Sequence, residues 1–300
     1  LHSLNGSESM KKGLYIPLLA LAAASLACSV SIDLPVETVK ETDTQIFTFS
    51  QPPLPGQDEV EISIVMGAGE LSIQSGSDQW VEGEIEFNVA NLEPRFTASG
   101  NVLEISQNIE SLRALPVGKT INQWDIALGS QTPMQLSVSA GAYDGDLDLS
   151  GLPITRLEIS DGASNATVRF EEPNPVEMER FVYRTGASAV RLGELANANF
   201  DELDFSGGAG SYELDFEGDL RRDARVRIES GVSSLVIRIP EGTRARIQIN
   251  GELLEVNTRG KWSVENNVYS TPPEDASSPG GPLLDIQVGT GLGSLELIHQ

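Results

Sequence analysis

The chain has 300 residues and a formal net charge of −24, with 20 basic against 44 acidic side chains. Hydrophobic residues make up 39% of it, too many for a disordered acidic polypeptide, and glycine and proline are abundant, at 29 and 16 residues. The acidity repels phosphate groups, which excludes nucleic acid as an expected partner and disfavours anionic lipid surfaces. The composition favours short strands joined by many turns.

Histidine and cysteine are scarce. The histidines are His2 and His299, and Cys28 is the only cysteine, so no disulfide can form within the chain. Because most nucleophilic, acid–base and zinc chemistry uses these side chains, the sequence predicts no catalytic residue, no metal and no cofactor. A polysaccharide-cleaving enzyme is the rival interpretation. It would use a carboxylate pair, with candidates among Asp201, Asp204 and Asp215.

Residues 10–28 read MKKGLYIPLLALAAASLAC and have the parts of a secretory signal. Lys11 and Lys12 precede an apolar run that is too short for a comfortable membrane span. The run ends at Cys28 and resembles a bacterial lipobox, although Ser25 stands where leucine is usual. We therefore expect Cys28 to be lipidated, so that the protein is exported and faces outside the cytoplasm on a membrane anchor. An ordinary cleaved signal peptide and an uncleaved anchor are the alternatives.

The part between this leader and the repeats is less regular. Residues 1–28 are taken as upstream residues and signal peptide, and residues 29–58 as a tether with a first strand at Gln45–Phe49. Residues 59–132 are expected to form a capping β region. Its alternating segments are Glu59–Val65, Leu71–Gln74, Val81–Val89 and Val102–Gln107.

From residue 133 to 300 the chain repeats one unit: strand, turn, strand, glycine corner. Glycines recur at intervals of 20 to 24 residues, which predicts an all-β, single-stack β-solenoid with coils of about 22 residues and a loop at 271–282. Glycine suits a corner that needs a positive φ or a close backbone approach. The expected corners, with two outside the regular series, are Gly67, Gly141, Gly162, Gly186, Gly208, Gly231, Gly251 and Gly291.

Apolar residues after each corner are expected to form one buried file through the stack, because alternate residues of a strand face the same side. The charged residues between them are expected to pair across coils, including Arg191 with Asp215. The predicted file consists of Leu147, Val168, Val190, Leu214 and Ile237.

Few residues stand out as binding candidates. Arg221, Arg222 and Arg225, with Arg227, form the only basic cluster. The expected role of the cluster is ion pairing with Glu213, Asp215 and Glu217 of the next coil, and an acidic-polymer site is the alternative. Trp262 is expected at the surface as a glycan platform. The segment Asp144–Asp148 carries three acids but lacks the later positions of a calcium loop, so no metal is predicted there.

The ordered set of corners resembles the toast-rack domain family, from about Glu59 to Leu297. The landmarks are Gly67-Ala68-Gly69, Trp124–Leu128 with Pro133, Leu149–Leu152, Ile239–Gly242, and Tyr269 ahead of Gly291–Gly293. The resemblance implies a stack of β-coils, kinship with repeat-built bacterial adhesins and with the C-terminal half of LiaF-type envelope-stress regulators, and no catalytic residues. We therefore expect a non-enzymatic, lipid-anchored module that binds an envelope protein or polysaccharide. An envelope-stress sensing partner is the alternative.

Overall fold

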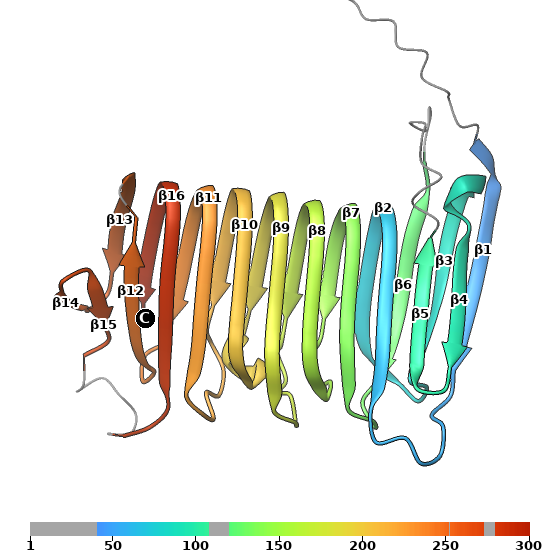
Figure 1. Ribbon diagram of the computed structural model, residues 1–300, viewed down its shortest axis with the longest axis horizontal. Coiled ribbons are helices and arrows are strands. Elements are labelled where there is room, and N and C mark those ends of the chain that lie inside the picture. Colours follow the sequence, from blue (N-terminus) through green and yellow to red (C-terminus); the bar gives the residue numbers. More distant parts are fainter. Residues whose placement is uncertain (1–40, 108–119, 252, 273–279) are drawn as a thin grey trace, which may run out of the picture. The chain divides into compact units, whose positions relative to one another are not determined.

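The computed structural model describes residues 41–107, 120–251, 253–272 and 280–300, which belong to one structural unit of residues 38–300. The unit is all-β, and its strands form one continuous sheet folded around a single core (Figure 1). The β-solenoid predicted from the glycine spacing is therefore confirmed. Cys28 lies outside the described residues.

The strands are β1 (Glu41–Gln51), β2 (Val60–Ser77), β3 (Val81–Val89), β4 (Pro94–Ser99), β5 (Val102–Gln107), β6 (Asn122–Gly129), β7 (Met134–Asp148), β8 (Ile154–Arg169), β9 (Met178–Gly193), β10 (Phe200–Asp215), β11 (Ala224–Ile239), β12 (Arg244–Asn250), β13 (Leu253–Arg259), β14 (Ser263–Glu265), β15 (Val268–Ser270) and β16 (Leu283–His299). Two short 3-10 helices are η2 (Ala90–Leu92) and η4 (Leu195–Ala198).

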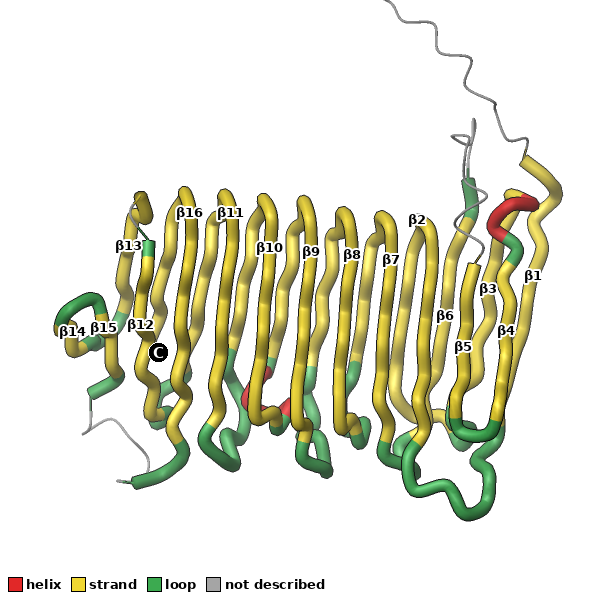
Figure 2. The backbone as a smooth tube through the Cα atoms, in the orientation of Figure 1, coloured by secondary structure: helices red, strands yellow, loops and turns green. Residues whose placement is uncertain are grey.

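The centre of the stack consists of long parallel strands in the order β2, β7, β8, β9, β10, β11, β16. Each of them rises along one side, bends near its middle and descends along the other side (Figure 2). We call the side made by the first halves the front wall, the side made by the second halves the back wall, and the bend the corner. One bent strand with its connection is one coil.

Close approach of the backbones explains the glycine at each corner. A Cβ atom built on Gly208 would lie 2.5 Å from the carbonyl oxygen of Gly186 in the neighbouring coil. The same contact recurs from coil to coil at 2.3 to 2.7 Å, a distance that no side chain tolerates. None of the glycines in this column has a positive φ, so the need is for space. The column consists of Gly67, Gly141, Gly162, Gly186, Gly208, Gly231 and Gly291.

The order of coils departs from the order of the sequence at the C-terminal end. Strand β16 lies between β11 and β12, so Gly291 contacts Gly231 (Figure 1). Gly251 follows β12 in the next coil outward, where Asn250 is level with Gly289 and Leu253 with Leu292. Gly251 is thus level with the residue before Gly291 and lies one residue off the column.

The interior is filled by in-register files of apolar side chains from both walls. The back-wall file predicted from the sequence is correct except at one coil. Val168 pairs with Leu192, and Val190 is buried in the adjacent file between Ala166 and Tyr212. Burying each such side chain contributes roughly 1.5–3 kcal/mol to stability. The observed file is Leu147, Val168, Leu192, Leu214, Ile237 and Leu297.

The N-terminal end of the sheet begins earlier than expected. The strand predicted at Gln45–Phe49 extends over all of β1 and pairs antiparallel with β3, so the sheet starts within the expected tether. Phe49 stacks on Phe96 of β4 at 5.2 Å between ring centroids, and Phe47 contacts Phe49. These rings cover the end of the core. Strand β2, placed in the capping region, is a full coil of the stack.

Gly208→Val tests the close approach at the corner. The added side chain must push the neighbouring carbonyl away, and we expect a loss of about 1–3 kcal/mol in the free energy of unfolding, measured by urea titration. The matched control is Ala209→Val, because Ala209 is exposed and Val232 occupies the same position in the next coil. The control should change stability by less than roughly 0.5 kcal/mol. Equal effects of both variants would contradict the close-packed corner.

Candidate functional site

The basic cluster singled out in the sequence does not form one open surface. Arg221 contacts Asp219 at 3.3 Å and the carbonyl of Asn174, while Arg225 contacts Asp201 at 3.2 Å and Glu202 at 3.0 Å. The partners expected for the cluster, Glu213, Asp215 and Glu217, are not among these contacts. Glu213 instead accepts from Arg191 at 3.5 Å and Arg238 at 2.8 Å.

Arg222 has a structural position. Its Nη2 donates to the carbonyls of Met178 at 2.9 Å and Asn199 at 2.5 Å, which ties the loop before β11 to the coils of β9 and β10. Trp262 lies at the C-terminal end of the stack, away from this cluster. Its indole packs on His299 at 5.7 Å between centroids and donates to the carbonyl of Arg259. Arg222 and Trp262 therefore belong to two separate structural contacts.

The acidic residues proposed for a cleavage reaction each contact a different partner. Asp204 pairs with Arg180, Asp201 pairs with Arg225, and the buried Asp215 accepts the backbone N–H of Glu217 at 3.0 Å. Among the described residues, no group of His, Cys, Asp or Glu is arranged to hold a metal ion, and this includes the acids of Asp144–Asp148.

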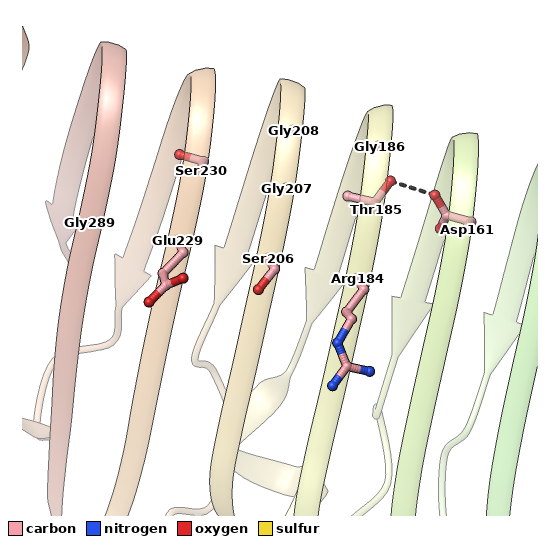
Figure 3. A pocket seen from close by; sticks show the side chains of 10 residues that line it. All are labelled: Asp161, Arg184, Thr185, Gly186, Ser206, Gly207, Gly208, Glu229, Ser230 and Gly289. Carbon is pink, nitrogen blue, oxygen red and sulfur yellow. Dashed lines mark hydrogen bonds between the residues drawn. The ribbon is translucent and has the colours of Figure 1, made fainter.

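A shallow depression lies on the front wall next to the corner (Figure 3). It crosses β8 to β11 and β16. It is open at β16 because Gly289 carries no side chain where the neighbouring coil carries Glu229. We call it the corner depression. Its lining residues are Asp161, Arg184, Thr185, Gly186, Ser206, Gly207, Gly208, Glu229, Ser230 and Gly289.

Asp161 anchors a network of hydroxyl groups beneath the depression. Its carboxylate accepts hydrogen bonds from Tyr183 at 3.0 Å, from Thr185, and from Ser188 at 3.3 Å. Thr185 and Ser188 also contact each other. Charge-assisted hydrogen bonds of this kind stabilise a half-buried carboxylate without a cationic partner. The network fixes the side of the depression formed by β8 and β9.

The hydroxyl groups continue along the stack. Ser230 lies 2.8 Å from Ser233 and donates to Thr290 of β16 at 3.2 Å. Between these two groups, the ring of Tyr212 fills the space beside Gly207. Burial raises the pKa of the Tyr212 phenol, and the nearby Asp161 charge adds to the effect. Tyr212 is therefore protonated at neutral pH and its hydroxyl group remains a donor.

One feature of the sequence, the type of residue that precedes each corner glycine, indicates this network. The residue before each corner glycine faces inward, yet Asp161, Thr185, Ser230 and Thr290 are polar at this position. In β2 and β7 the same position holds Met66 and Ala140. A switch from apolar to polar at one inward position indicates a polar layer beneath the corner.

The corner depression offers hydrogen-bond donors and acceptors on a rigid base. Arg184 pairs with Glu158 at 2.5 Å with both side chains about half exposed, so this weak pair can exchange for a ligand contact. His299, the histidine of the described region, is buried at the end of β16 and contacts the carbonyl of Lys261. The depression therefore suits non-covalent recognition.

The fold defines a β-solenoid protein whose coils turn at glycine corners. Residues 35–179 match the family model of the N-terminal domain of toast_rack, DUF2154. The resemblance inferred from the ordered corners is thereby confirmed. No curated protein sequence matches the chain. Among the described residues, none of the helices is both long and apolar enough to cross a bilayer.

Three solved bacterial structures show distant similarity. A candidate cell adhesion protein of Clostridium sporogenes is 17% identical, with a TM-score of 0.46 over 86% of this chain and 100% of that one. A candidate adhesin of Bacteroides fragilis is 10% identical, with a TM-score of 0.38 over 86% and 99%. A candidate lipid-binding protein of Parabacteroides distasonis is 12% identical, with a TM-score of 0.38 over 87% and 99%. These similarities are too distant to transfer a ligand.

Asp215→Asn tests the buried acid of the back wall. Burial raises the pKa of the Asp215 carboxyl above its value in the unfolded chain, so the folded state loses stability as the pH rises between the two pKa values. The variant keeps an acceptor for Glu217 and removes this loss. We expect a higher Tm than wild type at pH 7 and a smaller difference at pH 3.

The exposed Asp219→Asn is the control for this experiment and should show no gain that grows with pH. A variant at Asp215 that is less stable than wild type at pH 7 would contradict the assigned cost of ionisation.

Proposed function

We propose that this protein is a non-enzymatic interaction module of the cell envelope that binds a hydroxyl-rich polymer, such as a polysaccharide, at the corner depression. The observation that carries the proposal is the depression itself, which crosses five successive coils. Four spacings between neighbouring strands give it a length of roughly 19 Å. An elongated ligand can lie across the coils without entering an enclosed pocket.

The chemistry of the lining supports a polyhydroxylated ligand. Arg184 can donate, Glu229 and Asp161 can accept, and the hydroxyls of Ser206 and Ser230 can do both. Mixed donors and acceptors match sugar hydroxyl groups, which also have both roles. The glycine floor lets a ligand approach the backbone closely. Similar contacts repeat on successive paired strands, which suits a polymer because extended stacks bind through long surfaces.

The different contacts of the acidic residues support a binding function over a cleavage reaction. Hydrolysis of a glycosidic bond needs two carboxyl groups facing one substrate at a fixed separation. In the corner depression, Asp161 is held by Tyr183, Thr185 and Ser188, whereas Glu229 lies in the outward row that also contains Gly289. The two acids therefore differ in exposure and direction.

Filling the depression tests this function. Gly289 has open space around its Cα and no positive φ, so Gly289→Phe should fold normally while its ring occupies the site. The matched control is Ser139→Phe, in the same outward row but on β7, outside the depression. In affinity electrophoresis through gels containing neutral or acidic polysaccharides, wild type and control should be retarded. Gly289→Phe should bind at least about tenfold more weakly, a change of 1.4 kcal/mol.

Failure of every polysaccharide to retard the wild-type chain would refute the proposed ligand class. Equal binding by Gly289→Phe and wild type would place the binding surface elsewhere on the protein.

We propose in addition that Cys28 carries a lipid that holds the module at the membrane. The support is the sequence of residues 10–28, whose basic start, short apolar run and terminal cysteine are typical of a lipoprotein leader. Two acyl chains give stable membrane attachment, whereas one gives only reversible binding.

Cys28→Ala should move the exported protein from the membrane fraction to the soluble fraction, measured by fractionation and immunoblotting of expressing cells. Ser31→Ala leaves residues 10–28 unchanged and is the control that should remain with membranes. Membrane retention of Cys28→Ala would contradict lipid anchoring and favour an uncleaved anchor.

A further inference from the structure

Within the described part of the chain, four strands at the ends of the stack pair on one side only. At the N-terminal end these are β1, which pairs with β3, and β4, which pairs with β5. At the C-terminal end they are β13, which pairs with β16, and β14, which pairs with β15. An edge strand presents unpaired backbone N–H and C=O groups to any strand that approaches it.

Three of these edges carry features that hinder strand addition. Strand β4 begins with Pro94 and Arg95, and β13 carries Glu255 and Arg259. Strand β14 is only three residues long and ends in Glu265. Proline, charge and short length are the devices by which natural sheets avoid pairing at an edge.

Strand β1 carries its two acids, Glu41 and Asp43, at its start, and the rest of the strand lacks all three devices. Its segment Thr44–Gln51 has eight residues with no charge and no proline, in a chain where 21% of residues are charged. Most of them are β-branched or aromatic, the residue types that favour strands. Phe49 is buried in the core, whereas the large apolar side chain of Ile46 is 60% exposed. This edge is therefore left open to pairing.

We propose that two copies of this chain associate through their β1 strands, paired antiparallel about a twofold axis near Phe47. The occupant is a second copy because the edge is complementary to itself. An antiparallel pair related by a twofold axis brings the same patch of both chains together. With Phe47 at the axis, Ile46 of each copy lies opposite Thr48 of the other, and the exposed apolar surface of Ile46 is partly covered.

The distribution of charge permits this pairing. In that register Asp43 lies opposite Gln51, so the acids at the start of β1 meet neutral residues. The nearest acidic row, which includes Glu84, belongs to β3. The rows of the two copies are separated by three strand spacings, about 14 Å, beyond the Debye length of about 8 Å at physiological ionic strength. A net charge of −24 disfavours random contacts, so the uncharged edge is the place where two copies can meet.

Sedimentation equilibrium of the purified chain with Cys28→Ser tests the proposal. We expect a monomer–dimer equilibrium that shifts toward dimer as salt increases, since screening weakens the residual repulsion. Ile46→Lys combined with Thr48→Lys places lysine opposite lysine in the paired strands and should weaken association at least tenfold. Ser139→Lys, exposed on the front wall, is the control and should leave it unchanged.

A second measurement guards against misfolding of the lysine variant. Ile46→Cys and Thr48→Cys chains, each also carrying Cys28→Ser, are mixed in equal amounts, oxidised and run on a non-reducing gel. Disulfide-linked dimer should be abundant in the mixture, because the two positions lie opposite each other, scarce for Ile46→Cys or Thr48→Cys alone, and absent for Ser139→Cys. A monomer at all concentrations, larger assemblies without dimer, or cross-linking independent of position would overturn the proposal.

Discussion

The structure depends on the close approach of neighbouring backbones at the corner. A Cβ at the corner glycines would lie 2.3 to 2.7 Å from a carbonyl oxygen of the adjacent coil, so only glycine allows the strands to turn there and stay paired. With the corners stacked, both walls keep the same register from β2 to β16, and the apolar files on the two walls face each other across one core. The period of the sequence thus follows from a steric requirement.

This arrangement separates three environments along each strand. The inward positions of the walls are apolar, and the outward positions carry ion pairs between neighbouring coils. The inward position beside the corner is polar in β8, β9, β11 and β16 and is Gly207 in β10. The exposed pairs contribute little individually, typically below about 1 kcal/mol. The corner depression lies where the polar layer meets the front wall. The missing side chain at Gly289 opens it, and the Asp161 network holds one side of it in place.

Much of this fold could be predicted because each coil repeats the same local pattern, but the pattern leaves two ambiguities. Val190 and Leu192 are both apolar and face the same side, so the alternation alone could not decide which of them continues the file. Spacing along the chain also cannot reveal that β16 lies between β11 and β12. The same limit applies to ion pairs. Arg191 reaches Glu213 because the register across β9 and β10 places them side by side, two residues from the expected Asp215. The repeat pattern does not predict the corner depression, because the depression depends on which coil lacks a side chain at the outward position beside the corner.

Disulfide cross-linking between defined positions of neighbouring coils tests the central claim most directly. In the Cys28→Ser chain, Val232→Cys with Leu292→Cys places two thiols on exposed residues that follow stacked corner glycines, Gly231 and Gly291, on adjacent strands. Rapid formation of an intramolecular disulfide is predicted for this pair, since adjacent strands bring Cα atoms within the range that a disulfide spans. Val232→Cys with Leu253→Cys should not cross-link, because β16 separates the two strands. The reverse result would show that coils stack in simple chain order and that the column of corner glycines is wrong.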